Sequence, residues 1–222
     1  MDFYEALSRI KTQLNRYQPR KLQIQGAVPA AVLIPIFNKQ GLPYVLMTLR
    51  TDTVEHHKGQ ISFPGGAWED QDRNLEETAL RETEEEVGIP QREFTVLGEL
   101  DDFLTVTNFL VTPFVATLNY PFQAHPNTDE VAELLEVPLE LFLTDRYFRM
   151  EEREYFNQKF PVYFYDFNGY TIWGATAFIM NRFIELVFEF NPGPFSVLDD
   201  PRNELYLQEN ETRRAAKKRE QP

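Results

Sequence analysis

Residues 81–88 read Arg-Glu-Thr-Glu-Glu-Glu-Val-Gly, and this run constrains the fold of the chain more than any other segment. The surrounding periodicity predicts a helix over residues 76–87, with the final glycine as its C-cap. At ~100° per residue, Glu82, Glu85 and Glu86 fall within roughly 100° of one another on a single helix face. The fold must therefore keep three carboxylates close together.

Three neighbouring carboxylates repel one another, at about 0.2–0.5 kcal/mol per pair in an isolated helix. The ordinary explanation of such a run is a solvated acidic surface. Two adjacent features favour a binding site instead. Phe63-Pro64-Gly65-Gly66 lies before the helix and lets backbone approach a ligand closely, and Arg81 can hold a glutamate in place or contact phosphate. A hard divalent cation with oxygen ligands suits this face.

Helical and strand patterns intermix along the chain, which supports an α/β or α+β fold. Helices are expected over 2–18, 76–87, 128–135 and 175–188, with a short helical turn at 138–142. Strands are expected over 30–37, 44–49, 94–104 and 109–118, with a hairpin formed by 147–157 and 161–167 and a turn at 168–169. The stretch 59–66 is expected to be a loop or a short strand. The predicted division is an N-terminal helix at 1–20, a main domain at 21–200 and a charged tail at 201–222.

The composition excludes several functional classes. The net charge of −13 over 222 residues argues against a nucleic-acid partner, because such binders carry a basic surface. The absence of cysteine excludes disulfides, thiolate zinc sites and cysteine nucleophiles. No signal-like segment and no apolar run near ~20 residues is present, so we expect no membrane partner and a cytoplasmic location. An anionic phosphate substrate would require a divalent metal beside so many carboxylates.

Residues 66–89 resemble the signature of the Nudix hydrolase family. That signature runs Gly, five residues, Glu, seven residues, then Arg-Glu, an apolar residue, any residue, Glu-Glu, any residue, Gly and an apolar residue. The matching positions are Arg81, Glu82, Glu85, Glu86, Gly88 and Ile89. Asp72 stands where the first Glu belongs, with Glu69 as an alternative for that role. One extra residue precedes Arg81, and Thr83 occupies the apolar position.

These departures are similar to those of the coenzyme A pyrophosphatase branch of the family. The stretch 46–66 fits most of the signature that this branch carries upstream, ending in Phe-Pro-Gly-Gly. Glu55 departs from it, because an arginine is expected there. Residues 129–139 and 172–177 also look like this branch, and the resemblance covers roughly residues 27–185.

The resemblance implies an α/β/α sandwich around a mixed β-sheet, in which the signature forms a loop–helix–loop. It also implies a metal-assisted attack of water on phosphorus, with Mg²⁺ or Mn²⁺ as the cofactor. The metal ligands would be Glu82 and Glu86, with Glu85 a third or water-bridged one. The other candidate catalytic residues are Arg81 and Glu130, the latter as a proton acceptor or else as an ordinary acid at a helix start. The candidate substrate-binding residues are Arg50, Gly65, Gly66 and Lys58.

Three functions remain open at this point. The first is hydrolysis of coenzyme A or acyl-coenzyme A to 3′,5′-ADP and 4′-phosphopantetheine. The second is hydrolysis of ADP-ribose or another nucleoside diphosphate derivative, favoured because Glu55 would repel the 3′-phosphate of coenzyme A unless His56, His57 and Lys58 compensate. The third is a non-catalytic binding module, which the intact glutamate run opposes. The expected partner is a small-molecule nucleotide, and a homodimer is plausible.

Overall fold

The computed structural model describes residues 1–51, 59–155 and 158–194. Within them, eight strands form a mixed sheet in the order β3-β2-β1-β7-β5, in which β4 pairs with β1, β6 with β7 and β8 with β2. These strands are β1 Val28–Lys39, β2 Leu42–Arg50, β3 Ile61–Ser62, β4 Gly65–Ala67, β5 Phe94–Glu99, β6 Phe103–Leu104, β7 Phe109–Leu118 and β8 Val131–Pro138. A smaller sheet has the order β11-β10-β9, formed by β9 Phe148–Tyr155, β10 Gln158–Phe167 and β11 Tyr170–Trp173.

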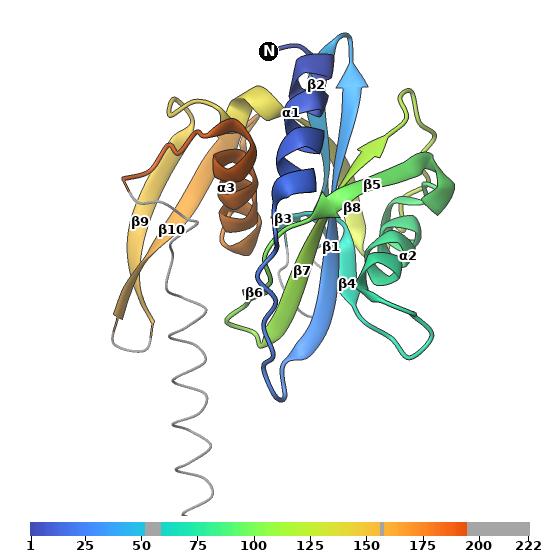
Figure 1. The fold of residues 1–222 in the computed structure, drawn as a ribbon, viewed down its shortest axis with the longest axis horizontal. Coiled ribbons are helices and arrows are strands. Elements are labelled where there is room, and N and C mark those ends of the chain that lie inside the picture. Colours follow the sequence, from blue (N-terminus) through green and yellow to red (C-terminus); the bar gives the residue numbers. More distant parts are fainter. Residues whose placement is uncertain (52–58, 156–157, 195–222) are drawn as a thin grey trace, which may run out of the picture.

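Helices cover both faces of the larger sheet (Figure 1). Their bounds are α1 Phe3–Arg16, α2 Leu75–Val87 and α3 Ala175–Phe188, with short 3₁₀ turns at Gln91–Glu93 and Leu139–Phe142. The central strand β1 alternates between the two faces: Ile34 and Ile36 pack with α1 and α3, whereas Leu33 and Phe37 pack with α2. A strand buried on both faces reads as a nearly continuous apolar run, which is what the sequence carries here. The predicted α/β sandwich around a mixed sheet is confirmed.

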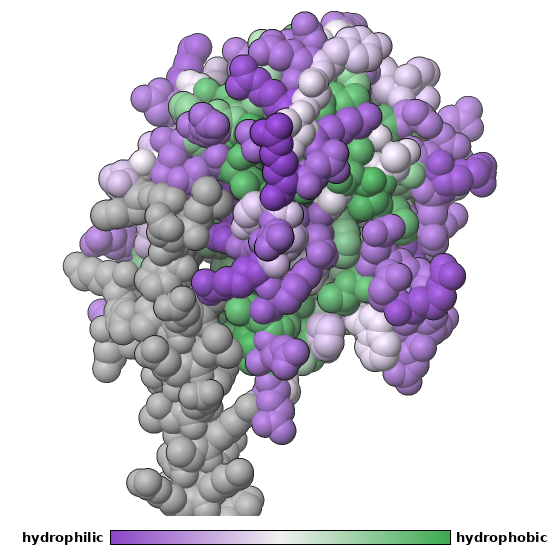
Figure 2. All heavy atoms as spheres, in the orientation of Figure 1, coloured by the Kyte–Doolittle hydropathy of each residue, from purple (hydrophilic) through white to green (hydrophobic). Residues whose placement is uncertain are grey.

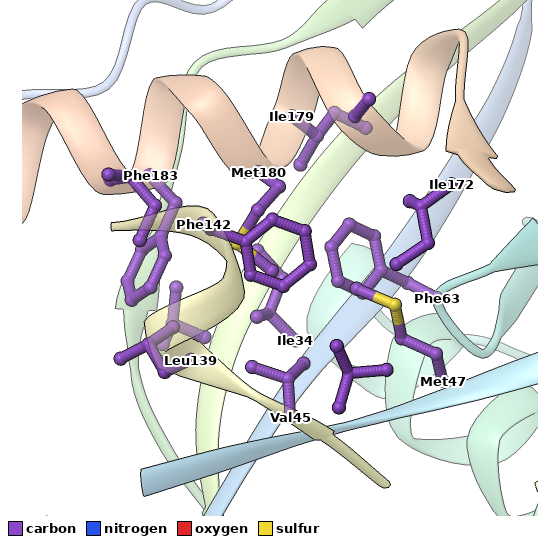
Figure 3. Close-up of a cluster of buried hydrophobic side chains, with 14 of the residues drawn as sticks. Ile34, Val45, Met47, Phe63, Leu139, Phe142, Ile172, Ile179, Met180 and Phe183 are labelled. Carbon is purple, nitrogen blue, oxygen red and sulfur yellow. The ribbon is translucent and has the colours of Figure 1, made fainter. Parts of the chain in front are cut away.

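The larger core lies between the sheet and α3. Met180 and Phe183 of α3 point toward Ile34 of β1 and Val45 of β2, with Phe142 between them (Figure 3). All five side chains are fully buried. This core fixes β1 and β2, whose ends carry the candidate site.

The N-terminal helix belongs to the same core. Ile10 and Leu14 are buried in it, and Asp2 caps the helix by accepting a hydrogen bond from the Glu5 amide. The segment after this helix is hydrogen-bonded to the segment after β5. Tyr17 Oη and the Arg20 amide both donate to Asp101 Oδ1. Figure 2 shows mainly hydrophilic residues on the outward side of this layer, with hydrophobic residues visible between α1 and α2.

Several element predictions are confirmed and one is wrong. The helices at 2–18, 76–87 and 175–188, the strands at 30–37, 44–49 and 109–118, and the hairpin are present. The expected strand at 94–104 is divided into β5 and β6, and the stretch 59–66 contains two short strands. The tail at 201–222 lies outside the described residues. No helix of the described chain is long and apolar enough to span a membrane.

The helix predicted over 128–135 is wrong, because β8 occupies most of this segment. Leu134 and Leu135 are adjacent apolar residues that also fit a helical spacing. In the structure they face opposite sides of the sheet, Leu135 toward α3 and Leu134 toward α2. Pairing with β2, an interaction that is remote in sequence, decided the conformation.

Candidate active site

Two glycines of β4 bring backbone against the acidic face of α2. Gly66 lies opposite Ala31 of β1, and a Cβ atom added to Gly66 would lie 2.3 Å from Glu82 Oε2. Gly65 has φ +149°, and an added Cβ would lie 2.3 Å from the Ala31 carbonyl oxygen. Glycine is therefore required at position 65, where the neighbouring atoms are backbone, whereas a side chain at position 66 would displace the Glu82 carboxylate. The structure places Gly65 against β1 and Gly66 against Glu82, and their approach to a ligand stays a prediction.

Helix α2 is oriented by its caps and by its apolar side. The Asn74 side chain accepts from the Glu77 amide at 2.9 Å, and Gly88 ends the helix in the left-handed conformation with φ +66°. Ala79 and Val87 are fully buried against the sheet. Because residues three and four apart share a helix side, this packing turns the side of α2 that carries Glu82 and Glu86 toward β4.

Glu86 is a buried carboxylate with few compensating contacts. Its side chain is 4% exposed, with Arg50 Nη1 at 3.4 Å from Oε1 and the Gly65 amide donating to Oε2 at 3.3 Å. Burial raises the pKa of Glu86 to about 8, against the opposing effects of Arg50 and the Gly65 N–H. The negative charges of Glu130 and Glu82 raise it further. A bound cation would relieve this unfavourable burial.

The other two glutamates of the run differ in exposure. The Glu82 side chain is 18% exposed, and burial raises its pKa in spite of the opposing Arg81 charge. The Glu85 side chain is 58% exposed. Arg81 Nη1 lies 2.9 Å from Glu82 Oε1 and 3.2 Å from Glu85 Oε2, so the guanidinium stands between them. Across the described ranges, no three acidic or histidine side chains converge as a ready metal cluster.

Arg81 is held by Asp72 through a two-point ion pair. Its Nε donates to Oδ1 at 2.8 Å and its Nη2 to Oδ2 at 2.9 Å. This contact holds the pKa of Asp72 well below its usual range. Thr78 Oγ1 donates to the same carboxylate at 2.9 Å, and the Ala67 carbonyl accepts from Arg81. Of the two acids considered for the first position of the signature, Asp72 is the one that pairs with Arg81, whereas Glu69 accepts from Gln71.

Sequence reasoning missed the parts played by Thr78 and by the Ala67 carbonyl. Thr78 lies six residues after Asp72, a spacing that carries no recognised pattern, and a backbone carbonyl leaves no trace in a sequence. Both contacts appear only when the loop before α2 folds back onto the helix.

Arg50 ends β2, and Glu130 immediately precedes the neighbouring strand β8. Arg50 pairs with Glu86, and its Nε atom is buried without a hydrogen-bond partner. Val131 is the cross-strand partner of Arg50, so Glu130 lies in the turn that leads into β8. The alternative of a helix-start acid for Glu130 is wrong, because no helix begins there. Lys58, together with the segment from Glu55 to His57, lies outside the described residues.

Without divalent cations, the free energy of unfolding should fall as pH rises from about 4.5 to about 8. The folded state raises the pKa of Glu86 from 4.5 to about 8, so it favours the protonated carboxyl. That contribution is fully present below about pH 4.5 and is lost as pH rises through about 8. Urea unfolding with a chelator across this range measures the effect. Glu86→Gln should lack this loss, and identical pH profiles for the two proteins would show that Glu86 is not the responsible group.

This chain is similar in sequence to a family model and to several known proteins. A family model described as NUDIX domain matches residues 27–158. A Pectobacterium atrosepticum protein named uncharacterized Nudix hydrolase NudL is 43% identical over 180 residues, covering 80% of this chain and 92% of that protein. Nudix hydrolase 15, mitochondrial, of Arabidopsis thaliana is 33% identical, covering 86% of this chain and 66% of that protein. A solved Nudix hydrolase from M. smegmatis, RenU, has 25% identity and a TM-score of 0.45, covering 54% of this chain and 75% of that chain.

Proposed function

Because this chain belongs to the Nudix hydrolase family, we propose that it hydrolyses the pyrophosphate bond of coenzyme A or acyl-coenzyme A. The products are 3′,5′-ADP and 4′-phosphopantetheine or its acylated form. The family supports the coarser statement, that the chain is a hydrolase of nucleoside diphosphate derivatives. One observation carries the site assignment: Gly65 and Gly66, which end the stretch resembling the coenzyme A branch, lie directly against Glu82 and Glu86.

The residues at this site fit a divalent cation. Their donors are carboxylate oxygens, which Mg²⁺ and Mn²⁺ prefer, and the buried Glu86 is subject to the negative charges of Glu82 and Glu130. Glu82 and Glu86 would hold the ion, with Glu85 as a third ligand or one that acts through water. When bound, the ion supplies positive charge that neutralises the diphosphate oxygens during attack by water. Mg²⁺ and Mn²⁺ both suit this donor set, so both belong in the test.

The side chains around Glu82 and Glu86 would bind the substrate, position a metal ligand and accept a proton. Arg50 would bind a phosphate of the substrate, because it lies at the end of β2 beside Glu86 and its Nε lacks a partner. Arg81 would position Glu82, which it contacts at 2.9 Å. Glu130 is the proposed proton acceptor for the attacking water, with a glutamate of the run as the alternative. The water oxygen bonds to phosphorus, the bridging P–O bond breaks, and the bridging oxygen leaves with the other phosphate.

A second candidate is hydrolysis of ADP-ribose or another nucleoside diphosphate derivative. Glu55 favours it, because a carboxylate repels the 3′-phosphate that distinguishes coenzyme A from its dephospho form. Lys58 is the nearby cation proposed to offset this repulsion. The chemistry at Glu82 and Glu86 is the same for both candidates, so substrate preference alone separates them.

The test compares release of phosphate-containing products from coenzyme A, dephospho-coenzyme A and ADP-ribose at equal concentration. Each substrate is assayed with Mg²⁺ and with Mn²⁺. We expect a higher kcat/KM for coenzyme A than for its dephospho form, since the 3′-phosphate would then be recognised. A preference for ADP-ribose or dephospho-coenzyme A would move the assignment to the second candidate. No turnover with either metal would refute both.

A further inference from the structure

Trp68 is an exposed aromatic residue two positions after Gly66, the glycine that lies against Glu82. It is 39% exposed and opens the loop that joins β4 to α2, which lies below α2 at the lower right of Figure 1. Its amide donates to the Pro29 carbonyl at 2.9 Å, which extends the pairing of β4 with β1 by one residue. Because alternate residues of a strand share a face, the Trp68 side chain leaves the strand on the side of Gly66, where Glu82 lies.

The indole is held in place by its polar edge. Its Nε1 donates to the Asp72 carbonyl at 3.2 Å, and the Asp72 carboxylate holds Arg81, which in turn contacts Glu82. One chain of contacts therefore connects the ring to the carboxylates. A ring fixed in this way loses little conformational freedom when a ligand stacks on it.

The two tryptophans of the chain differ in whether their rings are already stacked. Trp173 lies parallel to Phe164 with 6.0 Å between ring centroids, and the Arg153 guanidinium lies 5.4 Å from its ring. In the described part of the chain, no aromatic ring or cation stacks on Trp68. Trp68 is therefore the tryptophan that can accept a planar ligand.

The charge around Trp68 indicates which end of a nucleotide would lie there. An open hollow at the surface is lined by Trp68, Glu69, Asp70 and Gln71. Two carboxylates repel phosphate, so the diphosphate belongs nearer Arg50. A nucleobase carries no such charge, and the amino group of adenine can donate to a carboxylate. The hollow thus suits the base end of the ligand.

We propose that Trp68 is a specificity-determining residue, on which the base of a nucleoside diphosphate derivative stacks while its diphosphate lies at Gly66 and Glu82. This inference rests on the proposed function and names the part of the substrate that this surface recognises. Stacking of a base on an aromatic side chain has an effect of about ten-fold or more on binding when the side chain is removed.

The first test uses fluorescence with Mg²⁺ present. Trp173→Phe leaves Trp68 as the single tryptophan of the chain, and Trp68→Phe leaves only Trp173. Titration with ADP should quench the tryptophan fluorescence of the Trp173→Phe protein. The fluorescence of the Trp68→Phe protein should stay nearly unchanged. Inorganic pyrophosphate, which has no base, should quench neither. Absence of quenching by ADP in the Trp173→Phe protein would overturn the proposal.

The second test separates stacking from a purely structural role. Trp68→Ala should raise KM for the preferred substrate about ten-fold with kcat within about two-fold, whereas Trp68→Phe should recover most of the loss. A fall in kcat at unchanged KM would mean that Trp68 only positions the loop, and it would overturn the proposal. If the wild-type protein hydrolyses no substrate but ADP still quenches Trp68, the base site stands and the proposed function fails.

Discussion

Glu86→Gln should lower kcat/KM by about a thousand-fold or more. The substitution keeps the size of the side chain but removes the negative charge that would hold the divalent cation beside Gly65. Loss of that cation removes several kcal/mol of charge stabilisation from the transition state. Activity with the preferred substrate, measured over a wide range of Mg²⁺ concentration, and Mn²⁺ binding to each protein provide the test.

Glu84→Gln is the matched control on the same helix. Glu84 is two residues from both Glu82 and Glu86, a spacing that places its side chain about 200° away around the helix. This variant should retain wild-type activity and Mn²⁺ binding. The double variant Glu82→Gln/Glu86→Gln should bind no metal, and wild-type turnover by that protein would refute the site assignment.

Asp72→Asn should lower the free energy of unfolding by about 3 kcal/mol, since it removes the charge that compensates a largely buried guanidinium. The Asp72 side chain is 1% exposed and that of Arg81 is 11% exposed. Activity should fall as well, because Arg81 would then be free to shift away from Glu82. Urea unfolding of the two proteins at neutral pH measures the stability change.

The effect of Asp72→Asn should depend on pH in a defined direction. The pKa of Asp72 is lowered in the folded state, so its contribution is present above its ordinary pKa and is lost as pH falls through the folded value. The difference in stability between the two proteins should therefore shrink in strong acid. Arg73→Ala removes an exposed ion pair between the loop before α2 and Glu77 of that helix, and it should leave the urea midpoint near that of the wild type. Equal midpoints for Asp72→Asn and Arg73→Ala would contradict the structural role of Asp72.

The helix that carries the site could be predicted because its signals are local. Gly88 ends α2 in a conformation that glycine adopts readily, and the apolar spacing fixes which side of the helix is buried. The same local geometry places Glu82 and Glu86 on one side. The core helix α3 and the strand β1 were predictable for the same reason, since dense apolar runs mark buried elements.

Segments whose conformation depends on distant partners were harder to predict. Residues 131–138 carry apolar side chains that fit either a helix or a strand, and pairing with β2 selected the strand. That change moved Glu130 from a presumed helix start to a turn beside Arg50. Trp68 gave no signal in the sequence either, because its exposure and the hydrogen bond to Asp72 arise only from the folded loop.

The sequence by itself determined that helices and strands intermix and that three glutamates share one helix face, because periodicity and caps act within a few residues. The α/β sandwich and the hydrolase chemistry were implied by the resemblance of residues 66–89 to the Nudix signature. Only the tertiary structure decided which glutamate is buried and which acid pairs with Arg81. It buries Glu86 and exposes Glu85, although both lie on one helix side in the sequence pattern. It also pairs Arg81 with Asp72 rather than Glu69. Burial and ion pairing depend on which distant strand or loop covers a side chain, and a linear pattern of residues does not contain that information.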